Sequence, residues 1–443
     1  MVRIAPLRGV FYNQKKVRDL AKVVAPPYDV ISREEQEKLY HKSPYNFVRL
    51  DLSQEPDSYD TAAVLLQSWQ SEGILERDET PAIYFLAQKF SLKDGEVKER
   101  HGFFALTQLQ DFSSGDIRPH ENTLEGPKQD RLKLMIACHA QLSPIFALYS
   151  QPKRTINRIL SEQIEGKPPF ISVKPDGGGE CRLWRVAEPE VIGRIQREMK
   201  DQPLLIADGH HRYEATLAYR DHMRGQGSWN GREAFNYIMT YFANIDDDNV
   251  VILPTHRLVR GYAPKPFLQL EEALQTYFYI EQYPKTPEGK SWFLKALKNT
   301  GKKNRVIGAS FKRDPRYLIL RLKNKRIMQR LAKDVSAPLR EIELSILHLL
   351  VLEHILGLTP EQQTSGDTIR YSQDDDAVLQ SLEKEDFQAA FLVNPTKRAD
   401  ILAIVNGGEK MPQKSTYFYP KLMSGLVVNR IDPAEEIQEP AES

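Results

Sequence analysis

The clearest change of pattern along the chain lies in residues 204–223, LLIADGHHRYEATLAYRDHM. An apolar run stops at Asp208 and Gly209, and apolar side chains then recur at helical spacing, at Tyr213 and Leu217. This pattern predicts a strand, a tight turn and a helix. Glycine permits a backbone conformation that is closed to other residues, and aspartate is a residue type that caps helices, so both suit the turn.

The chain before this turn alternates between helical and extended patterns. Tyr28 and Asp29 follow a proline pair at the turn into a helix, where Ser32 and Glu35 have the spacing of a capping box. An Asp-Gly turn is expected to join two strands as a hairpin. The other predictions are a helix at 58–73, strands at 43–51, 82–92 and 99–112, and helix, strand, strand and helix within 153–202, with the glycine-rich stretch 176–179 as a hairpin tip.

From about Lys265 onward helices and strands alternate again, in a part with several charged connections. Helices are predicted at 267–278, 342–358, 375–386 and 396–410, and strands at 304–311, 316–322, 368–372 and 389–394. The predicted fold class is therefore α+β, with a mixed-sheet domain over residues 1–262 and a second α+β domain over 263–430. The acidic, proline-bearing tail, residues 431–443, is predicted to be disordered.

The composition of the chain excludes several classes of protein but does not indicate an activity. The 61 Lys and Arg residues nearly balance the 60 Asp and Glu residues, so a protein that coats nucleic acid is not expected. No apolar run is long enough to cross a membrane, and the N-terminal stretch lacks the pattern of a secretory signal. Two cysteines, Cys138 and Cys181, supply neither a disulfide framework nor a zinc cluster. We expect a cytoplasmic protein without a membrane partner.

Three stretches combine charged, histidine and hydroxyl side chains in a way that is typical of binding loops. The first is the central turn, where a helix start attracts anions and a bound phosphate would offset the unfavourable position of Arg212. The second is RPHENTLEGPKQDR, residues 118–131, and the third is KSTYFYPK, residues 414–421. His256 adds a further imidazole at the end of a predicted strand.

Two resemblances follow from these stretches. RPHENTLEGPKQDRL, ADGHHRYEATL, LPTHRLV and MPQKSTYFYPKLMSGLV together resemble the DUF1015 family, a bacterial and archaeal family without a settled activity. At a second level, GHHRYEA resembles the Gly-Cys-His-Arg-Tyr-Glu-Ala motif of the ParB/sulfiredoxin superfamily, which implies a ParB/sulfiredoxin-like fold for the first domain. That superfamily also includes free serine kinases and CTP-hydrolysing partition proteins. The resemblance implies that Gly209, His211 and Arg212 bind phosphate or a nucleotide.

The chain departs from the sulfiredoxin motif at His210, which stands where the catalytic cysteine would be. Reduction of a sulfinic acid is therefore not expected. His210 is instead a candidate general base or transient phosphate acceptor. Phosphoryl transfer also needs an orienting group and cations around the phosphate oxygens. The orienting candidates are Asp208, Glu121 and Asp29, and Lys128 and Arg131 are the additional phosphate-binding candidates.

The leading hypothesis is a phosphotransferase or phosphohydrolase of a small phosphorylated metabolite, with serine or phosphoserine as the most concrete candidate. ATP or ADP with Mg²⁺ is the expected cofactor, with Asp208 or Glu121 as candidate metal ligands, and a homodimer is a possible assembly. Arg118, His120, His256, Lys414, Ser415, Thr416 and Lys421 are the predicted substrate-binding residues. The alternative is a nucleotide-binding regulatory or DNA-associated protein of ParB-like type, which would bind nucleotide without turning over a small molecule.

Overall fold

The computed structural model describes residues 1–175, 179–263 and 267–438. The chain divides into two compact units. The first unit comprises Met1–Pro119, Thr123–Val251 and Pro420–Ser443, and the second comprises His120–Asn122 and Ile252–Tyr419. The sequence predicted a second domain that extends to residue 430. In the structure the chain returns to the first unit at residue 420.

Hydrogen bonds account for the return of the C-terminal segment to the first unit. The backbone of Val428 pairs with that of Val10, and β21 (Asn429–Arg430) pairs with β7 (Ala140–Gln141). Residues 431–438 of the expected disordered tail also make contacts, since the Ile437 N–H donates to the Arg232 carbonyl at 2.8 Å. Residues 439–443 lie outside the described part of the chain, as do residues 176–178 of the expected hairpin tip.

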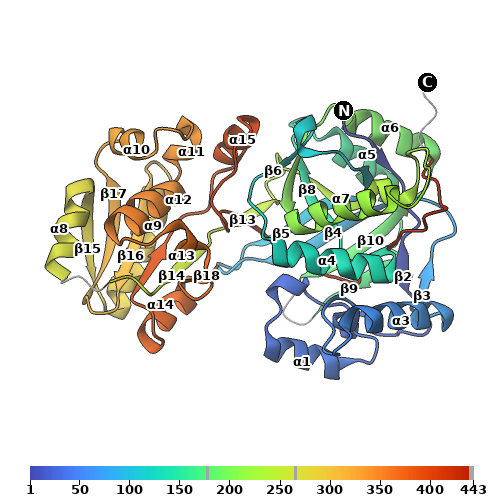
Figure 1. Cartoon of the computed structure of the whole chain (residues 1–443), viewed down its shortest axis with the longest axis horizontal. Helices are drawn as coiled ribbons and strands as arrows, with labels where there is room; N and C mark the ends of the chain where they lie inside the picture. The colour runs from blue at the N-terminus through green and yellow to red at the C-terminus, as the bar shows by residue number, and fades with distance from the viewer. Residues whose placement is uncertain (176–178, 264–266, 439–443) are drawn as a thin grey trace. The chain divides into compact units, whose positions relative to one another are not determined.

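Among the described residues, nine strands of the first unit form one mixed sheet in the order β6-β11-β8-β12-β5-β4-β10-β9, with β1 paired to β5 (Figure 1). The β11–β6 and β12–β8 pairs are parallel, and the other pairs are antiparallel. The strands are β1 (Ile4–Ala5), β4 (Ile83–Ser91), β5 (Val97–Gln108), β6 (Ile117–Pro119), β8 (Ile145–Tyr149), β9 (Ile171–Val173), β10 (Glu180–Val186), β11 (Leu204–Asp208) and β12 (Tyr237–Asn244).

The helices of the first unit pack apolar side chains against this sheet. Side chains of α5 and α6 join those of the central strands in the main core, and Tyr213 of α7 joins them. A smaller core joins α4 to the rest of α7, and the two helices lie side by side in Figure 1. The helices are η1 (Leu20–Lys22), η2 (Tyr28–Val30), α1 (Arg33–Lys42), α2 (Val48–Asp51), α3 (Ser58–Ser71), η3 (Phe112–Ser114), α4 (Glu125–Cys138), α5 (Thr155–Ile164), α6 (Pro189–Met199), α7 (His210–Arg224) and η4 (Ala234–Asn236), and β2 (Val10–Tyr12) with β3 (Leu75–Arg77) forms a small separate sheet.

The described part of the second unit is built on a six-stranded antiparallel sheet in the order β15-β17-β16-β19-β14-β18. Apolar side chains of α9 and α14 form a core with strands of this sheet. The elements are β13 (Val251–Leu253), β14 (His256–Val259), α8 (Phe267–Tyr277), β15 (Phe278–Pro284), α9 (Pro287–Gly301), β16 (Val306–Phe311), β17 (Arg316–Leu322), α10 (Arg326–Leu331), α11 (Ala337–Glu341), α12 (Glu343–Ser345), η5 (Ile346–Ile355), α13 (Pro360–Thr364), β18 (Ile369–Ser372), α14 (Asp375–Lys384), β19 (Ala389–Leu392), α15 (Arg398–Asn406) and β20 (Tyr417–Tyr419).

The α+β class is confirmed, and most elements fall where the periodicity placed them. The predicted strand at residues 43–51 is wrong, because the chain forms the short helix α2 there. Asn46 explains the difference: its side-chain oxygen accepts the Val48 N–H at 3.0 Å, and its amide donates to the Lys22 carbonyl at 2.8 Å. Such local bonds favour a turn over an extended strand. The Asn46 side chain is fully buried.

No helix in the described ranges is both long and apolar enough to span a bilayer.

The centre of the large sheet leaves no room for a side chain at Gly102, which lies on β5 between β4 and β12. A Cβ atom there would come within 2.4 Å of the Phe242 carbonyl oxygen and of the Tyr241 ring. We predict that Gly102→Ala lowers the free energy of unfolding by about 1–3 kcal/mol, as overpacking does.

Gly126, near the start of α4, provides a matched control because a Cβ atom there meets nothing within 4 Å. Gly126→Ala should raise the free energy of unfolding by about 0.4–1 kcal/mol, since it restricts the unfolded chain without a clash. Urea unfolding of both variants measures whether the free energy of unfolding falls in Gly102→Ala and rises in Gly126→Ala. Equal effects of the two substitutions would contradict the packing described for β5.

Candidate functional site

The central turn joins the end of β11 to the first turn of α7. Gly209 takes a left-handed conformation, with φ of 90°, and is the residue that precedes the helix. Asp208 is the last residue of β11 and its side chain does not cap α7, so the predicted capping role is wrong. A Cβ atom at position 209 would lie 2.9 Å from Nε of Arg212, so glycine also allows the Arg212 side chain to fold back over the turn.

Arg212 and Lys421 share the carboxylate of Asp208. Arg212 donates through one terminal nitrogen to Oδ2 of Asp208 and through the other to the Pro144 carbonyl. The Lys421 ammonium donates to Oδ1 of the same carboxylate. A positive charge near a helix N-terminus is unfavourable, and Asp208 supplies the compensating negative charge from within the chain. The sequence alone predicts a bound phosphate in that role, so the structure corrects this expectation.

This arrangement keeps Asp208 ionised. Burial by itself would raise the pKa of Asp208, but the charges of Lys421 and Arg212 outweigh burial and hold the pKa well below its usual range. His210 in its protonated form acts in the same direction. Asp208 is therefore a carboxylate at all physiological pH values, and it is a weak proton acceptor while both cations are in place.

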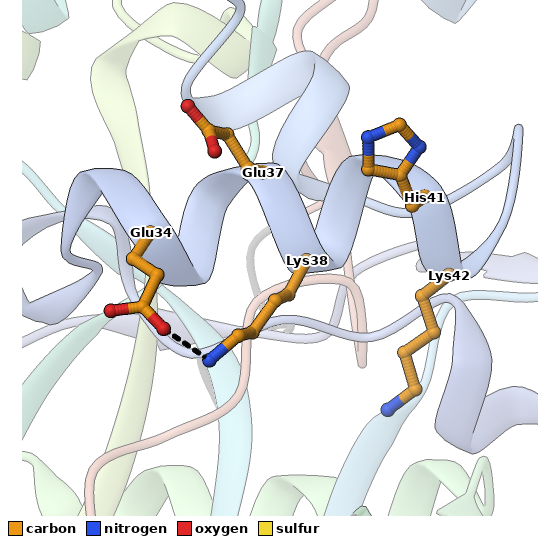
Figure 2. A pocket seen from close by; sticks show the side chains of 5 residues that line it. All are labelled: Glu34, Glu37, Lys38, His41 and Lys42. Atoms are coloured by element: carbon orange, nitrogen blue, oxygen red, sulfur yellow. Dashed lines mark hydrogen bonds and ion pairs between the residues drawn. The ribbon is translucent and has the colours of Figure 1, made fainter.

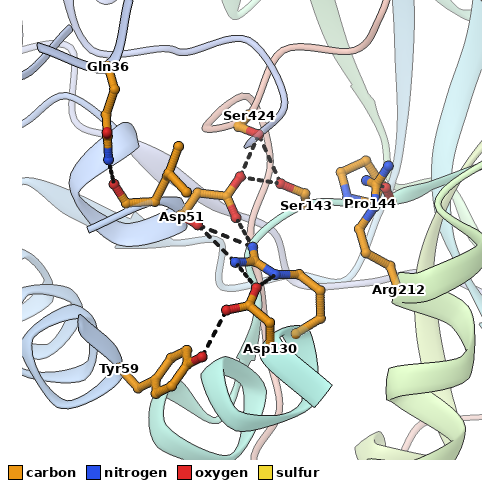
Figure 3. Close-up of polar contacts among 10 residues, drawn as sticks. Gln36, Asp51, Tyr59, Asp130, Ser143, Pro144, Arg212 and Ser424 are labelled. Atoms are coloured by element: carbon orange, nitrogen blue, oxygen red, sulfur yellow. Dashed lines mark hydrogen bonds and ion pairs between the residues drawn. The ribbon is translucent and has the colours of Figure 1, made fainter. Parts of the chain in front are cut away.

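A second network of buried charges adjoins the first. Arg131 on α4 pairs with Asp51 at 2.8 Å and with Asp130 at 2.6 Å. Ser143 and Ser424 both donate to Oδ2 of Asp51, at 3.2 and 3.0 Å, as Figure 3 shows. The Asp51 carboxylate is thus fully provided with donors, and it joins residues that lie far apart in the sequence.

Tyr28 lies beside both networks. The Arg131 guanidinium carbon is 3.9 Å from the centre of the Tyr28 ring. Burial raises the pKa of Tyr28 to about 12, and the charges of Arg212 and Arg131 lower it in part. Tyr28 is therefore a neutral hydroxyl at physiological pH, able to donate or accept a hydrogen bond.

A small pocket opens between the two networks, with a volume of about 10 Å³. This volume matches a single water-sized group, so a phosphate enters only if the ion pairs around Asp208 rearrange. The pocket is lined by Pro27, Ser143, Pro144, Phe146, Asp208, Arg212, Lys421, Leu422, Met423 and Ser424.

The other predicted residues of the first unit lie on or beside α7 and α4 and in the β6 strand, where several make local hydrogen bonds or ion pairs. His210 is buried in the first turn of α7. Nε2 of His211 accepts the Leu124 N–H, which precedes α4, at 2.9 Å. Lys128 pairs with Glu125 at 2.6 Å, and Arg118 donates to the Gly115 carbonyl at 2.7 Å.

The remaining predicted residues belong to the second unit. Nε2 of buried His120 lies 2.7 Å from the Thr416 hydroxyl and 3.6 Å from the Glu121 carboxylate. The Ser415 N–H donates to Glu121 at 3.0 Å, next to Lys414, which has a positive φ of 55°. His256 is 1% exposed, with Nε2 2.6 Å from Asp375 and Nδ1 accepting the Val393 N–H, so it is a partnered histidine of the second sheet.

Sequence analysis missed Asp51, Ser143, Ser424 and Arg257. Arg257 is fully buried and donates to the Lys414 carbonyl at 3.1 Å. Burial lowers its pKa to about 10. The available signal was the Thr-His-Arg run at the start of β14, but only its histidine was selected. Asp51 ends the short helix α2, Ser143 and Ser424 lie in connections, and none of the three stands in a distinctive pattern.

Among the described residues, these networks contain neither a reactive thiol nor a preformed metal site. Burial raises the pKa values of both Cys138 and Cys181 to about 12, so neither thiol is a ready nucleophile at neutral pH. Within residues 1–175, 179–263 and 267–438, no group of three or more His, Cys, Asp or Glu side chains is placed to hold a metal ion.

Figure 2 shows a hollow elsewhere on the first unit, along α1, lined by Glu34, Glu37, Lys38, His41 and Lys42. The Glu34–Lys38 ion pair, at 2.6 Å, joins two exposed side chains of this one helix. Exposed pairs of this kind contribute little energy. The hollow is a solvated helix face and contains none of the predicted site residues.

Comparison with known proteins identifies a family rather than an activity. The profile of a family described as "Protein of unknown function (DUF1015)" matches residues 4–345. None of the curated proteins compared with the chain matches it.

Several solved structures are similar to the chain at a low level. They include a free serine kinase in complex with AMP (12% identity, 69% of this chain and 86% of that chain, TM-score 0.32) and a conserved hypothetical protein from Pyrococcus furiosus (11%, 69% and 90%, 0.32). A third is SbnI with a C-terminal truncation from Staphylococcus aureus (11%, 70% and 83%, 0.33). At TM-scores this low, these similarities establish no activity for the chain.

The shared carboxylate predicts a specific pH dependence of stability. We expect Asp208→Asn to lower the free energy of unfolding near pH 7 by about 3 kcal/mol. This value is at the lower end of the loss in stability expected when a buried ion pair loses one partner. The side chains of Asp208, Arg212 and Lys421 keep 12–16% of their surface exposed, which reduces the loss. The pKa of Asp208 is lower in the folded than in the unfolded chain. The contribution of Asp208 to stability is therefore complete above its ordinary pKa of about 4, and it is lost as the pH falls toward the folded pKa.

The difference between wild type and Asp208→Asn should therefore shrink between about pH 5 and pH 2. Urea titrations at several pH values measure it. Asp248→Asn serves as the control, because it removes an exposed carboxylate that pairs with Arg154 at the surface. A wild-type and variant difference that stays constant over this range would show that Asp208 does not carry the depressed pKa.

Proposed function

The chain belongs to the DUF1015 family of proteins of unknown function, and we propose that its first unit is a phosphotransferase or phosphohydrolase of a small phosphorylated metabolite. The carrying observation is the convergence of three cations at one place. Arg131, Arg212 and Lys421 come from three distant stretches of the chain. Arg131 and Arg212 line one pocket of about 30 Å³, Arg212 and Lys421 line another of about 10 Å³, and Arg212 and Ser143 are common to both. Phosphate recognition depends on such clusters of guanidinium and ammonium groups.

Phosphate would enter by sharing the cations with Asp208. Arginine carries five N–H donors and lysine three, so a guanidinium and an ammonium can bind a second anion beside their carboxylate. The N–H groups at the start of α7 supply further donors. Because Asp208 and phosphate repel each other, entry requires the carboxylate to give up part of its contacts, which the small pocket volume also demands.

His210 is the proposed reacting side chain. It stands at the first position of α7, and its influence on the pKa of Asp208 supports a position near that carboxylate. A neutral imidazole can take a proton from an attacking hydroxyl or accept the phosphoryl group itself. Arg212 and Lys421 would stabilise the negative charge of the phosphate oxygens during the transfer.

Serine or phosphoserine is the proposed substrate, with ATP or ADP as phosphate donor or acceptor. The support is the resemblance of Gly209 to Ala215 to the phosphate-binding motif of the ParB/sulfiredoxin superfamily, which includes serine kinases. Mg²⁺ fits less well. Both carboxylate oxygens of Asp208 are engaged by cations, so this side chain is not a suitable ligand for the ion.

The test follows phosphorus NMR of the protein with phosphoserine and ADP, and separately with serine and ATP. We expect conversion by the wild type and its loss in His210→Gln. Arg212→Lys should weaken conversion about 10–100-fold, because a lysine keeps the charge but loses the forked donor geometry.

His222→Gln is the matched control, since His222 is an exposed histidine on the same helix. It should convert substrate at the wild-type rate. Conversion that persists in His210→Gln would remove His210 from the reaction. An absence of conversion together with broadened nucleotide resonances would replace the enzyme proposal with nucleotide binding alone.

A further inference from the structure

Lys421 reaches Asp208 from a segment that follows the whole second unit in sequence, so its position depends on what holds that segment. Two consecutive backbone carbonyls there are bound by buried side chains of the large sheet. Arg100 donates to the Pro420 carbonyl at 2.8 Å, and the Gln88 amide donates to the Lys421 carbonyl at 3.3 Å.

Gln88 and Arg100 act as a pair. They lie directly opposite each other on β4 and β5, and Arg100 donates to Oε1 of Gln88 at 2.6 Å. Gln88 is 3% exposed and Arg100 is fully buried. The guanidinium carbon of Arg100 also lies 4.8 Å from the centre of the Phe146 ring, and Phe146 lines the pocket beside Asp208.

The pair fixes the origin of a flexible side chain. A lysine has a four-carbon stem, and holding its ammonium in one place requires its backbone to be fixed first. The two carbonyl bonds restrict the backbone on both sides of the Lys421 Cα atom. Beyond them the segment is held by the backbone pairing of Ser424 with Ala25, at 3.1 and 2.8 Å.

We propose that Gln88 and Arg100 are positioning residues that place the Lys421 ammonium on the phosphate site. The biological role of this placement rests on the function proposed above. The placement itself is tested without any assay of activity. Gln88 donates one bond to the segment directly and accepts a bond from Arg100, which makes the other, so a single substitution at Gln88 weakens both.

The test measures how fast an amine-reactive acetylating reagent modifies Lys421 in the folded full-length chain, by mass spectrometry of its peptides. Only the unprotonated, accessible amine reacts, and pairing with Asp208 both favours the ammonium and shields it. We expect Gln88→Met to raise the rate at Lys421 about 5–10-fold, in line with the loss of one or two hydrogen bonds that hold the segment. Arg100→Met should act in the same direction, and Gln88→Met carries the test if Arg100→Met fails to fold.

Two controls separate positioning from general loosening. Lys89→Met changes the next residue of β4, whose side chain is exposed, and should leave the rate at Lys421 unchanged. Lys285 of the second unit, 14% exposed and bonded to the Phe311 carbonyl at 2.8 Å, is an internal reference that should not change in any of these variants. A parallel rise at Lys285 would mean general unfolding and would overturn the assignment.

Asp208→Asn sets the rate for a Lys421 without its carboxylate. A rate in Gln88→Met equal to that of wild type overturns the proposal, as does a wild-type rate equal to that of Asp208→Asn. Failure of the proposed function gives a different result. In that case phosphorus NMR shows neither phosphate binding nor conversion, while the acetylation rate at Lys421 still responds to Gln88.

Discussion

The first unit depends on one carboxylate that is shared by two cations from distant parts of the chain. Asp208 ends a central strand, Arg212 folds back from the helix that follows, and Lys421 arrives from the C-terminal segment. Removing Asp208 leaves two buried cations without their shared carboxylate, and removing either cation leaves one oxygen of Asp208 without its ion pair; both changes are destabilising in a mostly buried place. The turn, the helix and the returning segment are therefore bound to one another electrostatically.

The same constraint bears on ligand binding. An anion that binds Arg212 and Lys421 competes with Asp208, so part of its binding energy is spent on rearranging the existing pairs. The neighbouring network, in which Asp51 takes donors from Arg131, Ser143 and Ser424, has no comparable conflict because its carboxylate is fully satisfied. An anion that displaces Asp208 therefore rearranges the first network, while the second network keeps its bonds.

Local structure was largely predictable from the sequence, while the composition of the site was not. The strand, turn and helix around Gly209 follow from apolar periodicity and the conformational freedom of glycine. Asn46 shows the limit, since its bond to the Val48 N–H converts a predicted strand into a helix. Long-range partners leave no periodic signal: nothing local to Ser424 or Asp51 indicates that they meet, 373 residues apart.

Proximity in sequence was also a poor guide to which residues act together. The stretch 118–131 was interpreted as one candidate loop, yet it divides between the units. Arg131 pairs with Asp51 in the first unit, whereas His120 and Glu121 bond to Thr416 and Ser415 in the second. The late stretch 414–421 divides in the same way, because Lys421 alone of its predicted residues belongs to the first unit. Each stretch therefore supplies polar groups to both units, so residues that are neighbours in sequence belong to different hydrogen-bond networks.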